Sequence, residues 1–126
     1  MSTSTQTFRV SGIDITAYLV TDTKRALEFY RNVLGLEPTT VYPDDAGAEY
    51  EFSDGTTFGL YNGGDDFPFR ASGGVMFAVD DFDAAVSNAK AHGAAIMMQE
   101  ETPVCFMAMT QDTEGNGVII HKRKPV

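Results

Sequence analysis

The sequence predicts an α+β fold built from two similar β-α-β-β-β modules. An internal repeat is the first observation behind this prediction. Residues 15–27 (ITAYLVTDTKRAL) and 74–86 (GVMFAVDDFDAAV) share an apolar strand, an aspartate and a helical pattern, at an offset of 59 residues. A second pair, 54–61 (DGTTFGLY) and 114–121 (EGNGVIIH), repeats an acid-glycine turn and a β-rich run at an offset of 60. The chain of 126 residues has the length of one domain, which two such modules fill.

The first module is predicted to cover about residues 12–62. Its first strand runs over about Ile13–Val20, which is rich in β-branched and aromatic residues. Asp22 or Thr23 then caps a helix over about Lys24–Leu34, whose apolar residues recur at helical spacing, and Gly35 ends it. Three strands are predicted near residues 39–42, 49–52 and 57–61.

The second module is predicted over about residues 73–124, after a connector at about 62–72. It repeats the order of the first: a strand at Val75–Val79, then a helix at Phe82–His92. Three strands are expected near residues 95–99, 106–110 and 118–121. About ten polar residues precede the first module.

Charge and composition exclude several classes of function. With a net charge of −9, the surface would repel a phosphate backbone, so we expect no nucleic-acid partner. No apolar run reaches the ~20 residues of a membrane span, and the first residues lack a charged segment followed by an apolar one, so we expect neither a secretory signal nor a membrane partner. A single cysteine, Cys105, fits a reducing, cytoplasmic location. Residues 43–69 carry seven acids and no Lys or Arg, which indicates either a field for a cationic ligand or solvated loops.

Three segments carry a resemblance to a known family. They are LVTDTKRALEFYRNVLGL (19–36), FAVDDFDAAV (77–86) and QDTEGNGVII (111–120). With these segments the chain resembles the glyoxalase/bleomycin resistance protein/dioxygenase superfamily, also called the vicinal oxygen chelate superfamily. The resemblance implies mixed sheets that curve around a cleft, helices on the outside and, in many members, a dimer. It leaves the activity open, because the superfamily contains isomerases, dioxygenases, transferases and antibiotic-sequestering binders.

The resemblance also implies where a metal would be held. Enzymes of the superfamily bind a divalent ion through His and Glu side chains at four cleft positions, which correspond here to Ile15, Gly59, Gly74 and Ile119. Two of these residues are apolar and two have no side chain, so none supplies an N or O ligand. We therefore expect no metal at this site and no other cofactor, as in the bleomycin-binding members.

Strand alternation predicts which residues face the cleft. His121 lies two residues after Ile119 and so shares its face, where its imidazole acts as a base, orients a ligand or simply packs at the strand end. Small residues at Ala17, Gly59, Gly74 and Ala78 are expected to leave room for a ligand. The predicted cleft residues are Ile15, Ala17, Leu19, Gly59, Tyr61, Gly74, Met76, Ala78, Ile119 and His121.

Two strands leave alternatives open. In residues 102–109 (TPVCFMAM), alternation sends Cys105 and Met107 to one face, where they line either an adaptable pocket or the core. In residues 49–52 (EYEF), the cleft is acidic if Glu49 faces it and apolar if Tyr50 does.

Together these patterns predict a metal-independent small-molecule binding protein. Its ligand is expected to be apolar or aromatic, or cationic, and the protein is expected to form a homodimer. The alternative is a glyoxalase-like lyase or isomerase, or a dioxygenase, with non-standard metal ligands or with His121 as its base.

Overall fold

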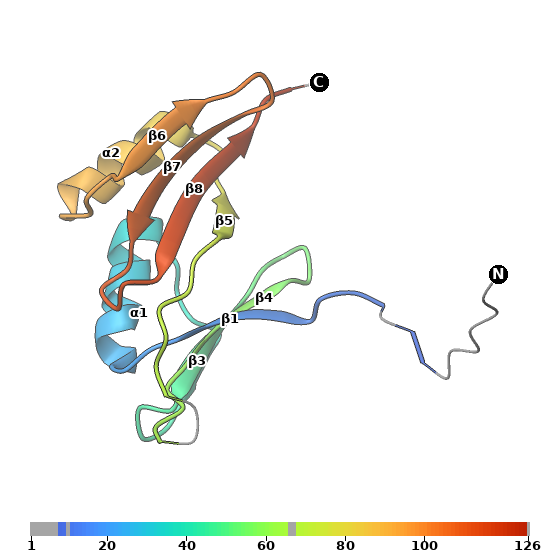
Figure 1. The fold of residues 1–126 in the computed structure, drawn as a ribbon, viewed down its shortest axis with the longest axis vertical. Coiled ribbons are helices and arrows are strands. Elements are labelled where there is room, and N and C mark those ends of the chain that lie inside the picture. The colour runs from blue at the N-terminus through green and yellow to red at the C-terminus, as the bar shows by residue number, and fades with distance from the viewer. Residues whose placement is uncertain (1–7, 10, 66–67, 126) are drawn as a thin grey trace.

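The computed structural model describes residues 8–9, 11–65 and 68–125 and contains two four-stranded sheets with two helices (Figure 1). The first module holds β1 (Ile15–Leu19), α1 (Thr23–Leu34), β2 (Thr40–Tyr42), β3 (Gly47–Glu51) and β4 (Thr57–Tyr61). The second holds β5 (Val75–Ala78), α2 (Phe82–Ala91), β6 (Met98–Glu101), β7 (Cys105–Gln111) and β8 (Gly117–Arg123). Residues 66–67 of the predicted connector lie outside the described ranges.

The predicted repeat is confirmed by the strand pairing. The sheets have the orders β1-β4-β3-β2 and β5-β8-β7-β6, and each is mixed because its first strand pairs in parallel with its last. Ala17 pairs with Gly59 in the first sheet, and Met76 pairs with Ile119 in the second. These two pairs are related by the same offsets of 59 and 60 residues that the sequence shows.

An aspartate precedes and caps each helix, which resolves the alternative for α1. The side chain of Asp22 accepts a hydrogen bond from Arg25 N, and that of Asp81 accepts one from Ala84 N. Gly35 ends α1 in the left-handed conformation, with φ of 68°. Among the helices of the described ranges, none is long and apolar enough to cross a bilayer.

The predicted position of the strand near residues 95–99 is wrong by about three residues. Strand β6 begins at Met98, because the preceding segment makes other contacts. The carbonyl of Ala95 accepts a hydrogen bond from Thr110 Oγ1 at 2.7 Å, and Ala94 N still donates to the end of α2.

Each sheet has one face covered by a helix and one face without a helix. Tyr30 of α1 contacts the rings of Tyr50 and Phe58, and Phe82 of α2 stacks on Phe106 of β7. Figure 1 shows both helices at the left of the view, beside the strands. We call the opposite face of each sheet its open face.

Hydrogen bonds join the two modules at their centre. The Tyr18 hydroxyl donates to the carbonyl of Gly117 at 2.7 Å and accepts from Val75 N at 2.9 Å. The fully buried side chain of Asn116 donates to the carbonyl of Leu19 at 3.1 Å. The turn between β7 and β8 is therefore tied to the first strand of the other module.

Candidate functional site

The open face of the first sheet is acidic rather than apolar along β3. Tyr50 is buried under α1, so alternation sends Glu49 to the open face, opposite Gly59 of β4. This resolves the alternative that the sequence left open. Strand pairing places five predicted cleft residues on this face: Ile15, Ala17, Leu19, Gly59 and Tyr61.

The space above Gly59 is filled by the ring of Tyr61. A Cβ at Gly59 would lie 2.5–2.6 Å from the far edge of that ring, and the Tyr61 hydroxyl donates to Glu49 Oε2 at 2.5 Å. Partial burial and the hydrogen bond to Glu49 raise the pKa of Tyr61 to about 12. The expectation that Gly59 leaves room for a ligand is therefore wrong, because the chain fills that room with its own side chain.

The open face of the second sheet is rich in methionine. Phe106 faces α2, so Cys105, Met107 and Met109 face the other way, and the pairing of β7 with β8 adds Ile119 and His121. Four of the six methionines of the chain share this face: Met76, Met98, Met107 and Met109. The predicted orientation of His121 beside Ile119 is confirmed.

A cavity of about 570 Å³ lies at one end of this methionine-rich face. It brings together three of the predicted site residues, Met76, Cys105 and His121, which come from three strands. Met107 and Ile119 lie on the same face, and so does Ala78, which pairs with His121. Gly74 lies just before β5, and the other predicted residues lie on the first sheet. The remaining lining residues are Pro103, Val104, Arg123, Lys124 and Pro125.

The sequence prediction missed Arg123, although alternation contained the signal. Strand β8 extends two residues beyond His121, so Arg123 falls on the same open face and pairs with Cys105. No described acid of the segment 43–69 lines this cavity. The described acids of this segment, which the sequence connected with a cationic ligand, therefore lie outside this cavity.

The reactive side chains of the cavity do not form a catalytic pair. Cys105 is buried, and its sulfur lies 3.2 Å from Thr102 Oγ1. His121 pairs across the sheet with Met107, two pairs further along the ladder than Cys105, and no residue of the described ranges hydrogen-bonds to its imidazole. A base that activates Cys105 would have to contact its sulfur, and the hydrogen-bonding contact of that sulfur is with Thr102 rather than His121.

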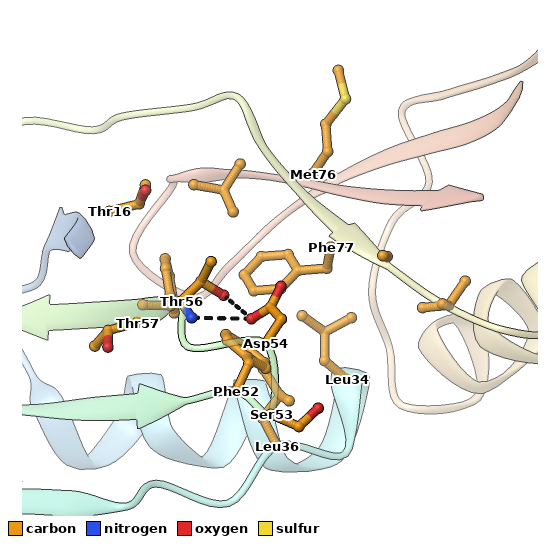
Figure 2. A pocket seen from close by; sticks show the side chains of 14 residues that line it. Thr16, Leu34, Leu36, Phe52, Ser53, Asp54, Thr56, Thr57, Met76 and Phe77 are labelled. Carbon is orange, nitrogen blue, oxygen red and sulfur yellow. Dashed lines mark hydrogen bonds between the residues drawn. The ribbon is translucent and has the colours of Figure 1, made fainter. Parts of the chain in front are cut away.

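A second cavity, of about 550 Å³, lies between the modules (Figure 2). The turn between β3 and β4, the end of α1 and strand β5 surround it. Asp54, the one acid among its described lining residues, accepts hydrogen bonds from Thr56 Oγ1 and Thr56 N, which lower its pKa. Leu34, Phe52 and Phe77 contribute apolar surface, so this cavity offers few polar groups to orient a ligand.

A family comparison agrees with this architecture. Residues 12–120 match the model of the Glyoxalase/Bleomycin resistance protein/Dioxygenase superfamily. The chain belongs to this superfamily. No match was found among curated proteins.

Several solved structures show the same fold. An antibiotic-binding protein, TnmS3 from Streptomyces sp. CB03234, is 22% identical, with a TM-score of 0.76, over 93% of this chain and 99% of that one. A lactoylglutathione lyase from Agrobacterium tumefaciens is 21% identical, with a TM-score of 0.73, over 90% and 95% of the two chains. A superfamily member from Sphaerobacter thermophilus is 20% identical, with a TM-score of 0.73, over 90% and 98%. At these identities the comparisons establish the fold alone.

The superfamily's metal does not fit the residues that this chain offers. Ile15 and Gly59 lie on one open face and Ile119 on the other, and neither isoleucine nor glycine has a side-chain donor atom. Within the described ranges, no group of three or more His, Cys, Asp or Glu side chains converges on one point.

Proposed function

We propose that this protein binds an apolar or aromatic small molecule on the methionine-rich open face of its second sheet. The observation that carries the proposal is the cavity beside Met76, Cys105 and His121, which continues a surface formed by four methionines. Its volume of about 570 Å³ falls within the ~300–1,000 Å³ typical of small-molecule sites.

Methionine is suited to such a surface. Its unbranched, polarizable side chain adapts to ligands of different shapes and makes favourable contacts with aromatic rings. Met107 and Met109 are half-buried, and Met76 is 51% exposed at the cavity, so a ligand would cover apolar surface that now faces solvent.

We propose further that binding needs no metal and that the working form is a homodimer in the cytoplasm. The donor-free positions Ile15, Gly59 and Ile119 support the first point. Large apolar side chains on both open faces, Ile15 at 45% and Met76 at 51% exposure, support a second copy of the chain. Free Cys105 is compatible with a reducing compartment. Light scattering coupled to size exclusion would measure the oligomeric state, and a monomer at micromolar concentration would contradict the dimer.

Fluorescence titration with N-phenyl-1-naphthylamine, a neutral aromatic dye, tests the binding site. Met76→Gln replaces an apolar side chain at the cavity by a polar one of similar length. We expect it to weaken dye binding by about fivefold, the effect of losing part of one methionine's apolar contact.

Met97→Gln is the matched control. Met97 is 57% exposed, close to the value for Met76, but it does not line the cavity. Dye affinity should therefore stay within about twofold of the wild type, since an exposed side chain away from the site makes no contact with the dye. If both substitutions weaken binding equally, or if the wild type does not bind the dye, the proposed site is wrong.

A further inference from the structure

The charges around the cavity indicate what kind of apolar molecule it accepts. Arg123, Lys124 and His121 all line it, and no Asp or Glu side chain of the described residues does. This is unusual for a chain with a net charge of −9. Because exposed charges are screened over about 8 Å at physiological salt, the groups that line the cavity determine the local potential more than the net charge does.

Lys124 does not contribute a free cation to the cavity. Its Nζ lies 2.6 Å from Glu101 Oε2 and 4.9 Å from the centre of the Phe106 ring. Phe106 faces α2, so the ammonium group of Lys124 lies toward the helix-covered side of the sheet rather than the open face.

Arg123 differs from Lys124. It is exposed on the open face, and it forms no ion pair with any acid in the described part of the chain. The acid on this open face, Glu100, pairs with Met107, so a full strand separates it from β8. Arg123 is therefore available to a ligand.

The spacing of Arg123 and His121 suits one anionic group. Side chains two residues apart on one strand face lie about 7 Å from each other. A carboxylate or sulfonate between them can accept two parallel hydrogen bonds from the guanidinium fork and one from the imidazole. Met76 and Val104 then provide apolar surface for the rest of the molecule.

We propose that the ligand of this site is an apolar acid whose anionic group is held by Arg123 and His121. This inference rests on the proposed small-molecule function and specifies its ligand class. It replaces the cationic ligand that the acidic segment 43–69 suggested, since no described acid of that segment lines the cavity.

Two dyes with one skeleton test the inference. Both 1-anilinonaphthalene-8-sulfonate and N-phenyl-1-naphthylamine contain the anilinonaphthalene group, but only the first carries a sulfonate. We expect the wild type to bind the sulfonate dye at least about tenfold more tightly, because a charge-assisted hydrogen bond adds that much affinity. Arg123→Gln should remove this preference and leave the affinity for the neutral dye unchanged.

Lys122→Gln is the control for net charge. Lys122 is the neighbour of Arg123 on β8, but it pairs with Phe106 and so lies on the helix side of the sheet. This substitution removes the same charge, and sulfonate-dye affinity should change by less than about twofold.

The outcomes separate the two proposals. Equal affinity of the wild type for both dyes, or equal effects of Arg123→Gln and Lys122→Gln, overturns the apolar-acid inference while the binding function stands. Failure of the wild type to bind either dye overturns both. Circular dichroism of each variant would confirm that the fold is retained.

Discussion

Two buried tyrosines that differ in one hydrogen bond give a quantitative test of the structure. Tyr30 is 0% exposed, and its hydroxyl donates to Asp112 Oδ2 at 2.9 Å. Tyr50 is 2% exposed, and its hydroxyl has no partner among the described residues. Replacing each by phenylalanine removes one hydroxyl and keeps the ring, so the two variants differ only in what the oxygen contacts.

The two substitutions are expected to change the free energy of unfolding differently. A hydrogen bond to a charged acceptor contributes about 1.5–3 kcal/mol. Asp112 would still accept hydrogen bonds from Asn116 Nδ2, Asn116 N and Glu114 N. We therefore expect Tyr30→Phe to cost about 1.5–2 kcal/mol, at the lower end of that range. Tyr50→Phe removes a buried hydroxyl without a described partner and should be neutral or stabilise the fold by up to about 1 kcal/mol.

Equilibrium unfolding in urea measures both variants. With a slope of about 1–3 kcal/mol per molar, the midpoints of the two variants should differ by about 1 M. The slopes should match the wild type, because neither substitution changes how much surface unfolding exposes. If Tyr50→Phe costs as much as Tyr30→Phe, the hydrogen-bond assignments in the core are wrong.

Three other outcomes can be measured. Burial alone would raise the pKa of Glu114, but hydrogen bonds from Thr21 and Arg25 outweigh it and lower the pKa below 4.5. Since the folded pKa lies below the unfolded one, this stabilisation is present above pH 4.5 and is lost as the pH falls through the folded pKa. Glu114→Gln should therefore lower the free energy of unfolding by about 1 kcal/mol at pH 7 and by less in acid. Urea titrations at several pH values would measure both differences. Gly59→Ala should push the Tyr61 ring off the sheet and return its pKa from about 12 toward 10, as followed by NMR titration, and a pKa that stays near 12 would contradict the ring position. Protein purified without chelator should contain no stoichiometric zinc, iron, nickel or manganese by elemental analysis, and one equivalent of any of them would refute metal-independent binding.

The sequence predicted the repeat because local patterns carry it. The acid that caps each helix, the glycine after α1 and the alternation along β7 are properties of neighbouring residues, and the structure confirms them. The same alternation put Met76 and His121 on the predicted cleft face and left Cys105 open between pocket and core, and the structure brings all three to one cavity.

The rest of the candidate site depends on long-range packing, which local patterns do not contain. The Tyr61 ring covers Gly59 because of its side-chain rotamer and its hydrogen bond to Glu49, and strand alternation does not determine either. Arg123 was missed because β8 runs past the predicted strand end. The predicted cleft residues also divide between the open faces of two sheets, because each module pairs its strands only with its own.

The hydrogen bonds of Tyr18 have a consequence for how the chain folds. Its hydroxyl joins groups 57 and 99 residues away, and Asn116 reaches back 97 residues to Leu19. A half-chain fragment would therefore lack the partners that satisfy its central polar groups, even though its sequence pattern is a complete module. Contacts so distant along the chain raise the contact order, which slows folding and joins both halves in one cooperative transition. A duplicated pattern has thus produced two halves that depend on each other, and a ligand that stabilises one half stabilises the whole chain.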